Sequence, residues 1–280
     1  MSVISIQSQV VFGHVGNSSA TFPLMLAGIQ VAPVPTAILS NNPRYPTLHG
    51  KVLDAEFVAD LLKGVEERGL TQGAGVILSG YVGSAETAGV IADFVRRAKA
   101  ANPAIVYVCD PVSGDMEPGF YVKEPVRAAI KDQLVPQADL ITPNQFELEF
   151  LCGGPARTEA DLIAAARALP PATVIVSGAR LETTPDGMLE TFAVTADSAW
   201  KVTTPKLPAR CSGTGDLMTS LFLAHRLRGE DLPAALGKAI SGMMAVLRET
   251  VAQDAMELQI VRTGQRLLEP ETLYEAVRVG

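Results

Sequence analysis

The sequence has few cysteines, few aromatic residues and no excess of basic residues. Its 280 residues include three cysteines, 5% aromatics, and 23 Lys and Arg against 30 Asp and Glu, which gives a net charge of -7. Cys109, Cys152 and Cys211 show no CxxC spacing, so a zinc ribbon and a thioredoxin-like motif are both excluded. An odd cysteine count in a long chain fits a reducing compartment better than a disulfide framework. The acidic balance argues against nucleic-acid binding as the main function.

Membrane and export signals are also missing. No stretch reaches the ~18 uninterrupted apolar residues that a membrane span requires. Residues 1–6 carry no basic residue before their apolar stretch, which disfavours a signal peptide. With 48% hydrophobic residues, the chain is too apolar to be disordered and can bury a sizeable core. We therefore expect a cytoplasmic protein that binds neither nucleic acid nor membranes.

Short apolar runs alternate with amphipathic stretches along most of the chain. The pattern predicts buried strands at residues 3–6, 31–39, 76–78, 105–108, 140–141 and 174–176. It predicts helices between them at residues 54–68, 85–101, 126–134 and 159–169. This alternation is typical of βαβ units, with a mainly parallel sheet covered by helices on both faces.

The order changes after residue 190. Residues 191–194 and 200–203 are predicted to form an antiparallel pair, and helices are predicted at about 216–228 and 233–251. No internal repeat, low-complexity tract or linker interrupts the chain. We therefore predict that residues 1–280 form a single domain.

Two common nucleotide-binding signatures are absent. There is no G-x-x-x-x-G-K-[ST], so the phosphate site is not a P-loop, and there is no G-x-G-x-x-G to indicate a nicotinamide dinucleotide. His14, His49 and His225 lack metal-ligand spacing. We expect them at the surface or in supporting positions.

Polar residues follow the predicted strands. Since parallel α/β sheets bind ligands at the carboxyl ends of their strands, these residues are expected to converge on one rim. They are Gln7-Ser8, Ser40-Asn41, Ser79-Gly80-Tyr81, Cys109-Asp110-Pro111, Thr142-Pro143-Asn144 and Ser177-Gly178. Such a rim suits a small polar ring compound and a phosphate donor.

The motif S-G-T-G-D at residues 212–216 opens a predicted helix. Its two glycines permit a tight turn whose N–H groups point into one concavity at the positive end of the helix dipole. This geometry suits a phosphoryl group that gains charge in a transition state, with Asp216 placed to accept a proton from an attacking hydroxyl. The alternative is that Asp216 only favours a helix N-terminus, as acidic residues in a first turn do.

A second motif, T-P-N-Q-F-E, occupies residues 142–147. Asn144 followed three residues later by Glu147 resembles a capping box, and that structural interpretation is sufficient by itself. The functional alternative is that Glu147 holds a magnesium ion, partly through water, against donor phosphates, with Asp110 in the same cluster.

The segment S-N-N-P-R-Y-P at residues 40–46 is polar, rich in turn-forming residues and placed after a strong strand. α/β proteins often place binding loops at such positions. The composition is explained equally well by an ordinary surface loop.

These motifs resemble those of the pyridoxal kinases, which are vitamin B6 kinases of the ribokinase-like superfamily. The matching segments occur in family order: S-I-Q-S-Q-V at 5–10, G-H-V-G-N-S at 13–18, S-N at 40–41, S-G-Y-V-G-S at 79–84, C-D-P-V at 109–112, T-P-N-Q-F-E-L-E at 142–149 and G-T-G-D at 213–216. Together with the C-terminal helices they span nearly the whole chain. G-T-G-D is shared across the superfamily, while Q-S near the start and G-Y after the third strand are more specific to B6 kinases.

The resemblance implies a three-layer α/β/α sandwich with a mainly parallel sheet and a small flap over the active site. It implies ATP-dependent phosphorylation of the 5'-hydroxymethyl group of pyridoxal, and of pyridoxamine and pyridoxine, by a homodimer that uses Mg²⁺. A monovalent cation remains open as a further requirement. Carried over to this chain, the catalytic residues are Asp216 as the base and an anion hole formed by Gly213, Thr214 and Gly215.

The resemblance also implies two sets of binding residues. The substrate residues, among which Ser8 would hydrogen-bond the pyridine ring and Tyr81 would pack against it, are Ser8, Val15, Asn17, Asn42, Pro43, Arg44, Tyr81 and Asp216. The residues implied at ATP are Asp110, Thr142, Asn144, Glu147, Ser177, Lys206 and Leu207, with Glu147 and Asp110 holding Mg²⁺ partly through water.

Two positions depart from the family pattern. The flap commonly reads Ser-Asn-His-Thr in the family, whereas here it reads S-N-N-P at residues 40–43. Ser177 stands where bacterial members often carry a lysine near ATP, and Arg180 or Lys206 is the candidate to supply that charge. Neither departure touches the implied base or anion hole.

Three alternatives remain at this point. A hydroxymethylpyrimidine kinase shares the fold, the anion hole and a hydroxymethyl ring substrate. A B6-binding protein with little catalysis, acting as a reservoir for pyridoxal phosphate, is suggested by the altered flap. A ribokinase-like sugar kinase is the weakest alternative, because the chain lacks a longer Gly-rich N-terminal sugar motif.

Overall fold

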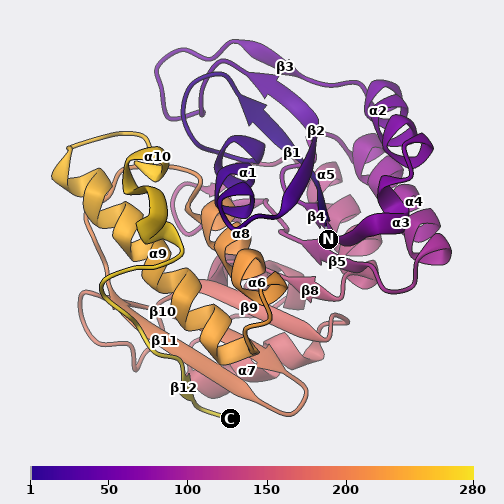
Figure 1. The fold of residues 1–280 in the computed structure, drawn as a ribbon. Helices are drawn as coiled ribbons and strands as arrows, with labels where there is room; N and C mark the ends of the chain where they lie inside the picture. Colours follow the sequence, from indigo (N-terminus) through magenta and orange to yellow (C-terminus); the bar gives the residue numbers. More distant parts are fainter. Residues whose placement is uncertain (1) are drawn as a thin grey trace.

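A single ten-stranded sheet forms the centre of the molecule (Figure 1). The computed structural model describes residues 2–280. The strands lie in the order β12-β11-β10-β9-β8-β5-β4-β1-β2-β3. In chain order they are β1 (Ser2–Val10), β2 (Gln30–Leu39), β3 (Gly50–Val52), β4 (Ala74–Ser79), β5 (Val106–Cys109), β8 (Leu140–Ile141), β9 (Thr173–Ala179), β10 (Met188–Thr195), β11 (Ala199–Pro205) and β12 (Val277–Arg278). A small separate hairpin pairs β6 (Gly114–Asp115) with β7 (Gly119–Phe120).

The central six strands, from β2 to β9, are parallel, and the strands outside them are antiparallel. The carboxyl ends of the parallel strands therefore meet along one edge of the sheet, where binding loops of such folds converge. The predicted mainly parallel sheet and the antiparallel pair near residues 190–205 are both confirmed.

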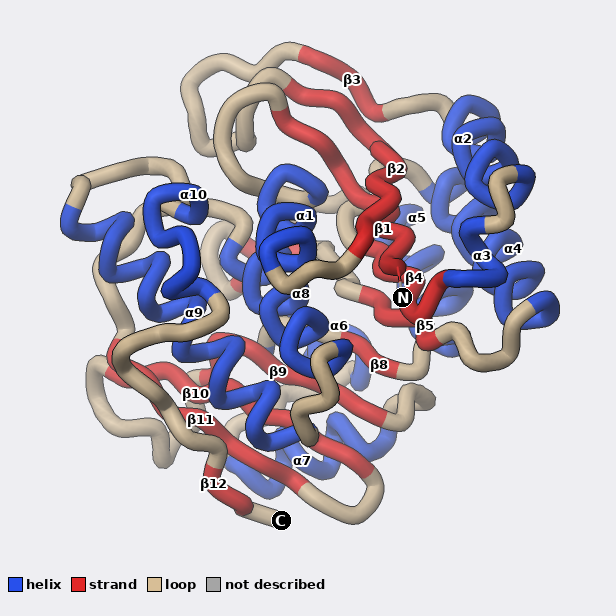
Figure 2. The backbone as a smooth tube through the Cα atoms, viewed as in Figure 1, coloured by secondary structure: helices blue, strands red, loops and turns tan. Residues whose placement is uncertain are grey.

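Helices cover both faces of the sheet (Figure 2). One face carries α2 (Ala55–Glu67), α3 (Leu70–Gly73), α4 (Ala85–Ala101), α5 (Glu124–Ala129), α6 (Gln145–Cys152) and α7 (Glu159–Ala168). The other carries α1 (Asn17–Leu26), α8 (Thr214–Leu227), α9 (Leu232–Ala252) and α10 (Ile260–Thr263). The three-layer α/β/α sandwich that the sequence predicts is therefore confirmed.

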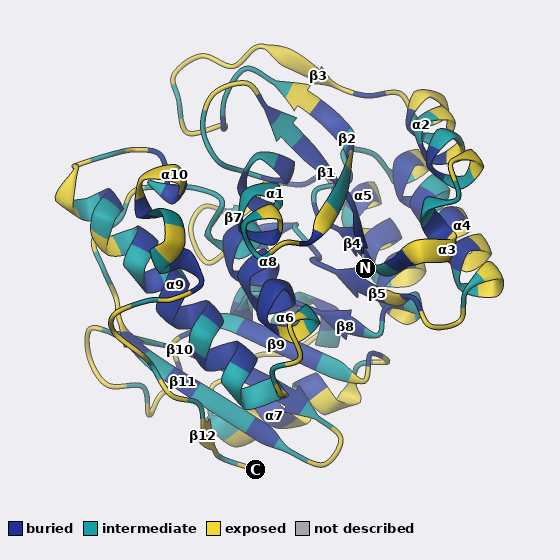
Figure 3. Cartoon of the chain, viewed as in Figure 1, coloured by how far each residue is buried: buried dark blue, intermediate teal, exposed yellow. Residues whose placement is uncertain are grey.

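Alternation along the strands divides the core into two halves. Ile4 and Ile77 belong to the core half under α2 and α4, while Val3 and Val76 belong to the half under α1, α8 and α9. Successive side chains of a strand point to opposite faces of the sheet, and here both faces are buried. Helix α8 lies deepest, with every residue from Leu217 to His225 buried, and it is mostly dark blue in Figure 3.

Several predicted boundaries were wrong. The predicted first strand ended at residue 6, which placed Gln7 and Ser8 after it, but β1 continues to Val10. The extension arises because β1 keeps pairing with β2 beyond a bulge between Gln7 and Gln9. Ser177 and Gly178 likewise lie inside β9, since pairing with β10 carries that strand to Ala179.

Two helices near the predicted rim were not predicted. Helix α1 has the sequence N-S-S-A-T-F-P-L-M-L, with Pro23 inside it and three polar residues in its first turn. The helical spacing of its apolar residues is therefore weak. Helix α6 follows the capping box at Asn144 but is only eight residues long. The predicted helix over residues 126–134 is α5 continued by a π-helical stretch, Ile130–Leu134. Within residues 2–280, no helix combines the length and apolar character needed to cross a bilayer.

Packing between α8 and α9 should contribute strongly to stability. Leu221 is fully buried in α8 and lies against the α9 backbone, where a β-carbon at Gly242 would contact its Cδ1 at 3.4 Å. We predict that Leu221→Ala lowers the free energy of unfolding by about 2–5 kcal/mol, because it removes buried methyl groups and leaves a cavity. Urea unfolding of this variant should be compared with Leu273→Ala, whose side chain is exposed and whose cost should stay within ~0.5 kcal/mol. Equal losses of unfolding free energy in the two variants would show that the α8–α9 contact at Leu221 does not stabilise the fold.

Candidate active site

Asp216 lies in the first turn of α8, and the turn before it has room only for glycine. Gly213 caps the helix in the left-handed region, with φ +86°. A β-carbon there would lie 2.0 Å from the backbone oxygen of His14. The N-terminus of α8 is therefore packed directly against the loop between β1 and α1.

That loop supplies a hydrogen-bond donor to Asp216. The backbone N–H of Gly16 donates to Asp216 Oδ2 at 2.8 Å. Gly16 has φ +54°, and a β-carbon on it would lie 2.3 Å from the backbone oxygen of Ser8. Burial raises the pKa of the Asp216 carboxyl, and the Gly16 N–H partly opposes that rise. Asp216 is thus held in one orientation and made more basic than an ordinary aspartate.

Three carboxylates come together beside this turn. Asp110, directly after β5, is buried, and its pKa lies well above the ordinary value because of burial first and then repulsion from Glu147 and Asp216. The Thr142 hydroxyl partly opposes the rise by hydrogen bonding to Asp110. A β-carbon at Gly215 would lie 3.8 Å from Asp110 Oδ2, so the turn before α8 and the end of β5 adjoin.

Glu147 serves as a structural cap and as a member of this cluster. Its Oε2 accepts the Asn144 N–H at 3.0 Å, and its Oε1 accepts the N–H groups of Ser113 at 2.7 Å and Gly114 at 3.3 Å. The predicted capping box with Asn144 is confirmed. Burial raises the pKa of Glu147 to about 7, although the three N–H donors lower it.

The cluster offers carboxylate groups that could hold a magnesium ion. Buried carboxylates that repel one another call for a cation between them, and Mg²⁺ is usually bound through one or two carboxylates, waters and substrate phosphates. No set of three or more His, Cys, Asp or Glu side chains within residues 2–280 has the geometry of a direct metal cage. Because both Glu147 oxygens already accept N–H bonds, Asp110 is the better direct ligand and Glu147 the better partner for a bound water.

The residues predicted at ATP fall into two groups. Thr142 accepts a hydrogen bond from Thr219 of α8 at 2.9 Å, and Asn144 forms an isolated parallel bridge with Ser177. These three predicted residues therefore adjoin the carboxylates along the edge formed by β5, β8 and β9. Lys206 and Leu207 follow β11, where the Lys206 N–H donates to Gly187. Across residues 2–280, neither they nor Arg180 form an ion pair or side-chain hydrogen bond with the cluster.

The residues predicted at the substrate lie around the bulge of β1. Asn17 is fully buried, and its Nδ2 donates to the backbone oxygens of Gln7 and Val34, while its Oδ1 has no partner. Ser8 packs against Gly16, and Val15 lies beside Gly213. Tyr81 is half-buried after β4, and burial raises the pKa of its hydroxyl. The Asn17 side chain is enclosed by protein, and its contact with a substrate remains a prediction.

The predicted flap, at residues 40–46, lies in the segment of residues 40–49 between β2 and β3, which we call the flap from here on. Pro43 and Arg44 are exposed, whereas Asn42 is buried. The Asn42 amide is already occupied: its Nδ2 donates to Glu257 Oε1 at 2.5 Å, and its Oδ1 accepts the Arg44 N–H at 2.9 Å. Its substrate role remains a prediction.

Sequence reasoning missed two parts of this site. Gly16 was noted only within a motif, and its N–H contact with Asp216 depends on tertiary packing. Glu257 belongs to no motif, yet it is buried and contacts both the β1–α1 loop and the flap. No local pattern in the sequence around residue 257 would have indicated it.

Comparisons with known proteins agree on one group of enzymes. The family model described as phosphomethylpyrimidine kinase matches residues 26–260. A pyridoxal kinase PdxY of Rubrobacter xylanophilus is 41% identical, covering 100% of this chain and 98% of its own, and one of Leifsonia xyli is 40% identical over 100% of both. The pyridoxal kinase of Leishmania donovani in complex with ADP and pyridoxamine superposes with a TM-score of 0.92 at 27% identity, covering 99% of each chain.

The Gly16 contact should be sensitive to one added methyl group. We predict that Gly16→Ala lowers the free energy of unfolding by about 3 kcal/mol or more, from backbone strain plus overlap with the Ser8 backbone. Gly153→Ala is the matched control, since it has φ +76° but no heavy atom within 4 Å of its β-carbon. It should cost only about 1–2 kcal/mol in the same urea titration. Equal losses would contradict the close packing at Gly16.

The carboxylate cluster should make metal-free stability fall as pH rises. Glu147 has a folded pKa of about 7 against an ordinary value of 4.5, so the unfolded chain releases its proton first on the way up. We predict that the free energy of unfolding in EDTA decreases between pH 5 and pH 7.5 by on the order of 3 kcal/mol. Added Mg²⁺ should restore part of it at pH 7.5.

Asp110→Asn is expected to flatten this profile, because it removes a second buried carboxyl group whose own pKa is raised, first by burial. Asp60→Asn on the exposed side of α2 should leave the profile as in the unaltered protein. A flat profile in the unaltered protein would show that the pKa values of these buried carboxyls are not raised.

Proposed function

The chain belongs to the pyridoxal kinase family, and from that premise we propose that it transfers the γ-phosphoryl group of ATP to the 5'-hydroxyl of vitamin B6 vitamers. The Leishmania donovani structures of this family were solved with ADP and with pyridoxamine or pyridoxine, which are the two kinds of ligand that this reaction needs. The observation that carries the residue assignment is the orientation of Asp216 by the Gly16 N–H at 2.8 Å, beside the carboxylates of Asp110 and Glu147.

In the proposed mechanism Asp216 acts as the base. The 5'-hydroxyl oxygen bonds to the γ-phosphorus, the bond from that phosphorus to the bridging oxygen of ADP breaks, and the hydroxyl proton goes to Asp216. The raised pKa of Asp216 favours this transfer, since a base works best when its pKa approaches the working pH. The Gly16 N–H holds the other side of the carboxylate and fixes its direction.

Backbone N–H groups at the start of α8 would stabilise the charge on the transferred group. Gly213, Thr214 and Gly215 form the turn and first residues of that helix, where N–H groups have no intrahelical partner. Such donors are already oriented before the reaction and need no rearrangement. They allow an acidic protein to hold an anionic donor without a basic pocket.

When bound, Mg²⁺ would neutralise charge on the ATP phosphates. Asp110 and Glu147 would hold it, with Thr142 orienting Asp110. Asn17 and Ser8 are proposed to bind the pyridine ring, Tyr81 to pack on it, and the flap at residues 40–49 to exclude water. Ser177 is proposed beside the nucleotide.

The remaining features implied by the family resemblance are part of the proposal. They are a homodimeric assembly, a cytoplasmic location, and contacts of Lys206 and Leu207 with ATP. Sedimentation equilibrium tests the assembly, and ATP affinity in Lys206→Ala tests the contact. Monovalent-ion dependence is tested by exchanging potassium for a large organic cation in the assay.

A hydroxymethylpyrimidine kinase is the second candidate, because the matching family model is described as phosphomethylpyrimidine kinase. Its substrate is also a hydroxymethyl ring compound. A panel of pyridoxal, pyridoxine, pyridoxamine and hydroxymethylpyrimidine separates the two candidates. A higher kcat/KM for any of the three vitamers than for the pyrimidine supports the first, and the reverse ratio supports the second.

The base assignment predicts a large loss of turnover. Asp216→Asn is expected to lower kcat for pyridoxal by about 10²–10⁴-fold, because the amide cannot accept the proton. ADP binding, measured by calorimetry, should stay within about threefold, which separates loss of chemistry from misfolding. Asp60→Asn is the control and should keep full turnover. A kcat for Asp216→Asn within tenfold of the unaltered enzyme would show that another group is the base.

A further inference from the structure

Glu257 is a buried carboxylate outside every motif, in the segment between α9 and α10. It is 7% exposed. Its Oε2 accepts the backbone N–H of His14 at 3.0 Å, and its Oε1 accepts the Asn42 amide at 2.5 Å. Burial and then the charge of the same carboxylate raise the pKa of the Tyr45 hydroxyl in the flap. Three segments far apart in sequence therefore meet at one side chain: the β1–α1 loop, the flap and the C-terminal region.

The loop beside Glu257 is shaped to fit it. Gly13 has φ +97°, and a β-carbon on it would lie 2.2 Å from Glu257 Oε2. Only glycine permits this approach. A second contact joins the same loop to the flap, because Phe12 packs edge-on against Tyr45, with ring centres 6.0 Å apart.

The same loop reaches Asp216 within three residues. His14 donates to Glu257 through its N–H, and its carbonyl oxygen packs on Gly213. Two residues later, Gly16 donates to Asp216. Residues 13–16 are thus bracketed by two carboxylates, Glu257 at one end and the proposed base at the other.

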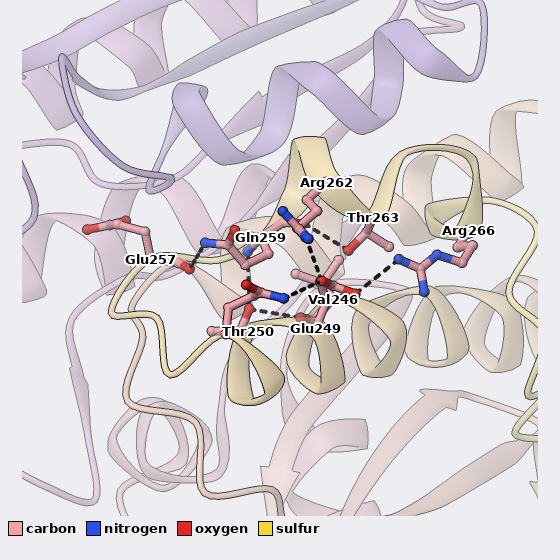
Figure 4. Close-up of polar contacts among 9 residues, drawn as sticks. Val246, Glu249, Thr250, Glu257, Gln259, Arg262, Thr263 and Arg266 are labelled. Carbon is pink, nitrogen blue, oxygen red and sulfur yellow. Dashed lines mark hydrogen bonds and ion pairs between the residues drawn. The ribbon is translucent and has the colours of Figure 1, made fainter.

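The backbone that carries Glu257 is itself anchored to α9 (Figure 4). Gln259 Nε2 donates to the Glu257 backbone oxygen at 3.0 Å, and the Gln259 N–H donates to Thr250 Oγ1 at 3.1 Å. Arg262 and Arg266 both pair with Glu249 on the same helix. Figure 4 shows the Glu257 side chain extending away from this network, so the carboxylate projects from a fixed support.

We propose that Glu257 is a positioning residue that couples the flap to the catalytic base. It holds the flap through Asn42, and it holds the β1–α1 loop through His14, so that flap closure and the orientation of Asp216 depend on the same carboxylate. The inference rests on the proposed kinase function for its kinetic part only. Its structural part, attachment of the flap, is testable without activity.

The structural test uses the exposed Arg44 in the flap as a trypsin site. In Glu257→Ala, cleavage after Arg44 should be about tenfold faster or more, because opening of the flap no longer breaks a charged hydrogen bond. Glu257→Gln keeps the volume and should accelerate cleavage less. Glu269→Gln is the control, because its carboxylate is exposed and is not part of this support, and it should leave the Arg44 cleavage rate unchanged. Cleavage of Glu257→Ala at the unaltered rate would refute the attachment.

A donor–acceptor exchange makes the test independent of simple destabilisation. Asn42→Asp alone sets two carboxylates against each other and should speed cleavage. Combined with Glu257→Gln, it restores a carboxylate–amide pair in the opposite sense, so the double variant should be cleaved more slowly than Asn42→Asp. A double variant cleaved as fast as Asn42→Asp, or faster, would overturn the proposed contact.

The kinetic test separates this inference from the proposed function. If the unaltered protein phosphorylates pyridoxal, Glu257→Gln should raise KM for pyridoxal and lower kcat, each by about three- to tenfold, while KM for ATP stays within twofold. Unchanged kcat and KM would refute the coupling to the base. If the unaltered protein phosphorylates none of the vitamers or the pyrimidine, the proposed function fails, and the cleavage result still decides the flap attachment.

Discussion

The hydrogen bond from Gly16 to Asp216 is the contact on which the rest of the site depends. It joins residues 200 positions apart and requires close approach of two backbone segments, which glycine permits at Gly16 and at Gly213. The sheet brings the two segments together, since β1 lies inside it, between β2 and β4, and α1 and α8 pack side by side on one face. A loop and a helix terminus that are each fixed by the core can hold a carboxylate in one direction without further contacts. The fold thus pre-orients the proposed base before any substrate binds.

The same packing also concentrates negative charge at the site. Bringing α8 against the ends of β5 and β8 places Asp216 near Asp110 and Glu147, in a chain whose net charge is already -7. Two devices offset this concentration of charge. Backbone N–H groups hydrogen-bond to Glu147 and Asp216, and the remaining repulsion favours the divalent cation that we propose there. A nucleotide bound with its metal would then reduce the repulsion between the carboxylates.

Parts of this site were predictable because their signals are local. The turn at Gly213 and the capping box of Asn144 and Glu147 depend on residues within one helical turn, and both were identified from spacing. The positions of Ser8 and Ser177 were predicted wrongly because strand length is set by pairing partners: β2 extends β1, and β10 extends β9. Glu257 was not predictable at all, since its contact with Asn42 spans 215 residues and leaves no period or motif in the sequence.

The two interpretations of Glu147 that the sequence left open are not exclusive. The Glu147 carboxylate caps α6 and also accepts the Ser113 N–H, so three backbone donors fix its position. In that position it would bind a metal-bound water without rearranging. Glu257 follows the same logic on the other side of the site, where one carboxylate accepts from the loop and from the flap. In both cases N–H donors held in place by the fold, from the backbone at Glu147 and from the backbone and an amide side chain at Glu257, fix a flexible acidic side chain. In this way an acidic chain with few basic residues near the site builds a rigid polar centre from loops.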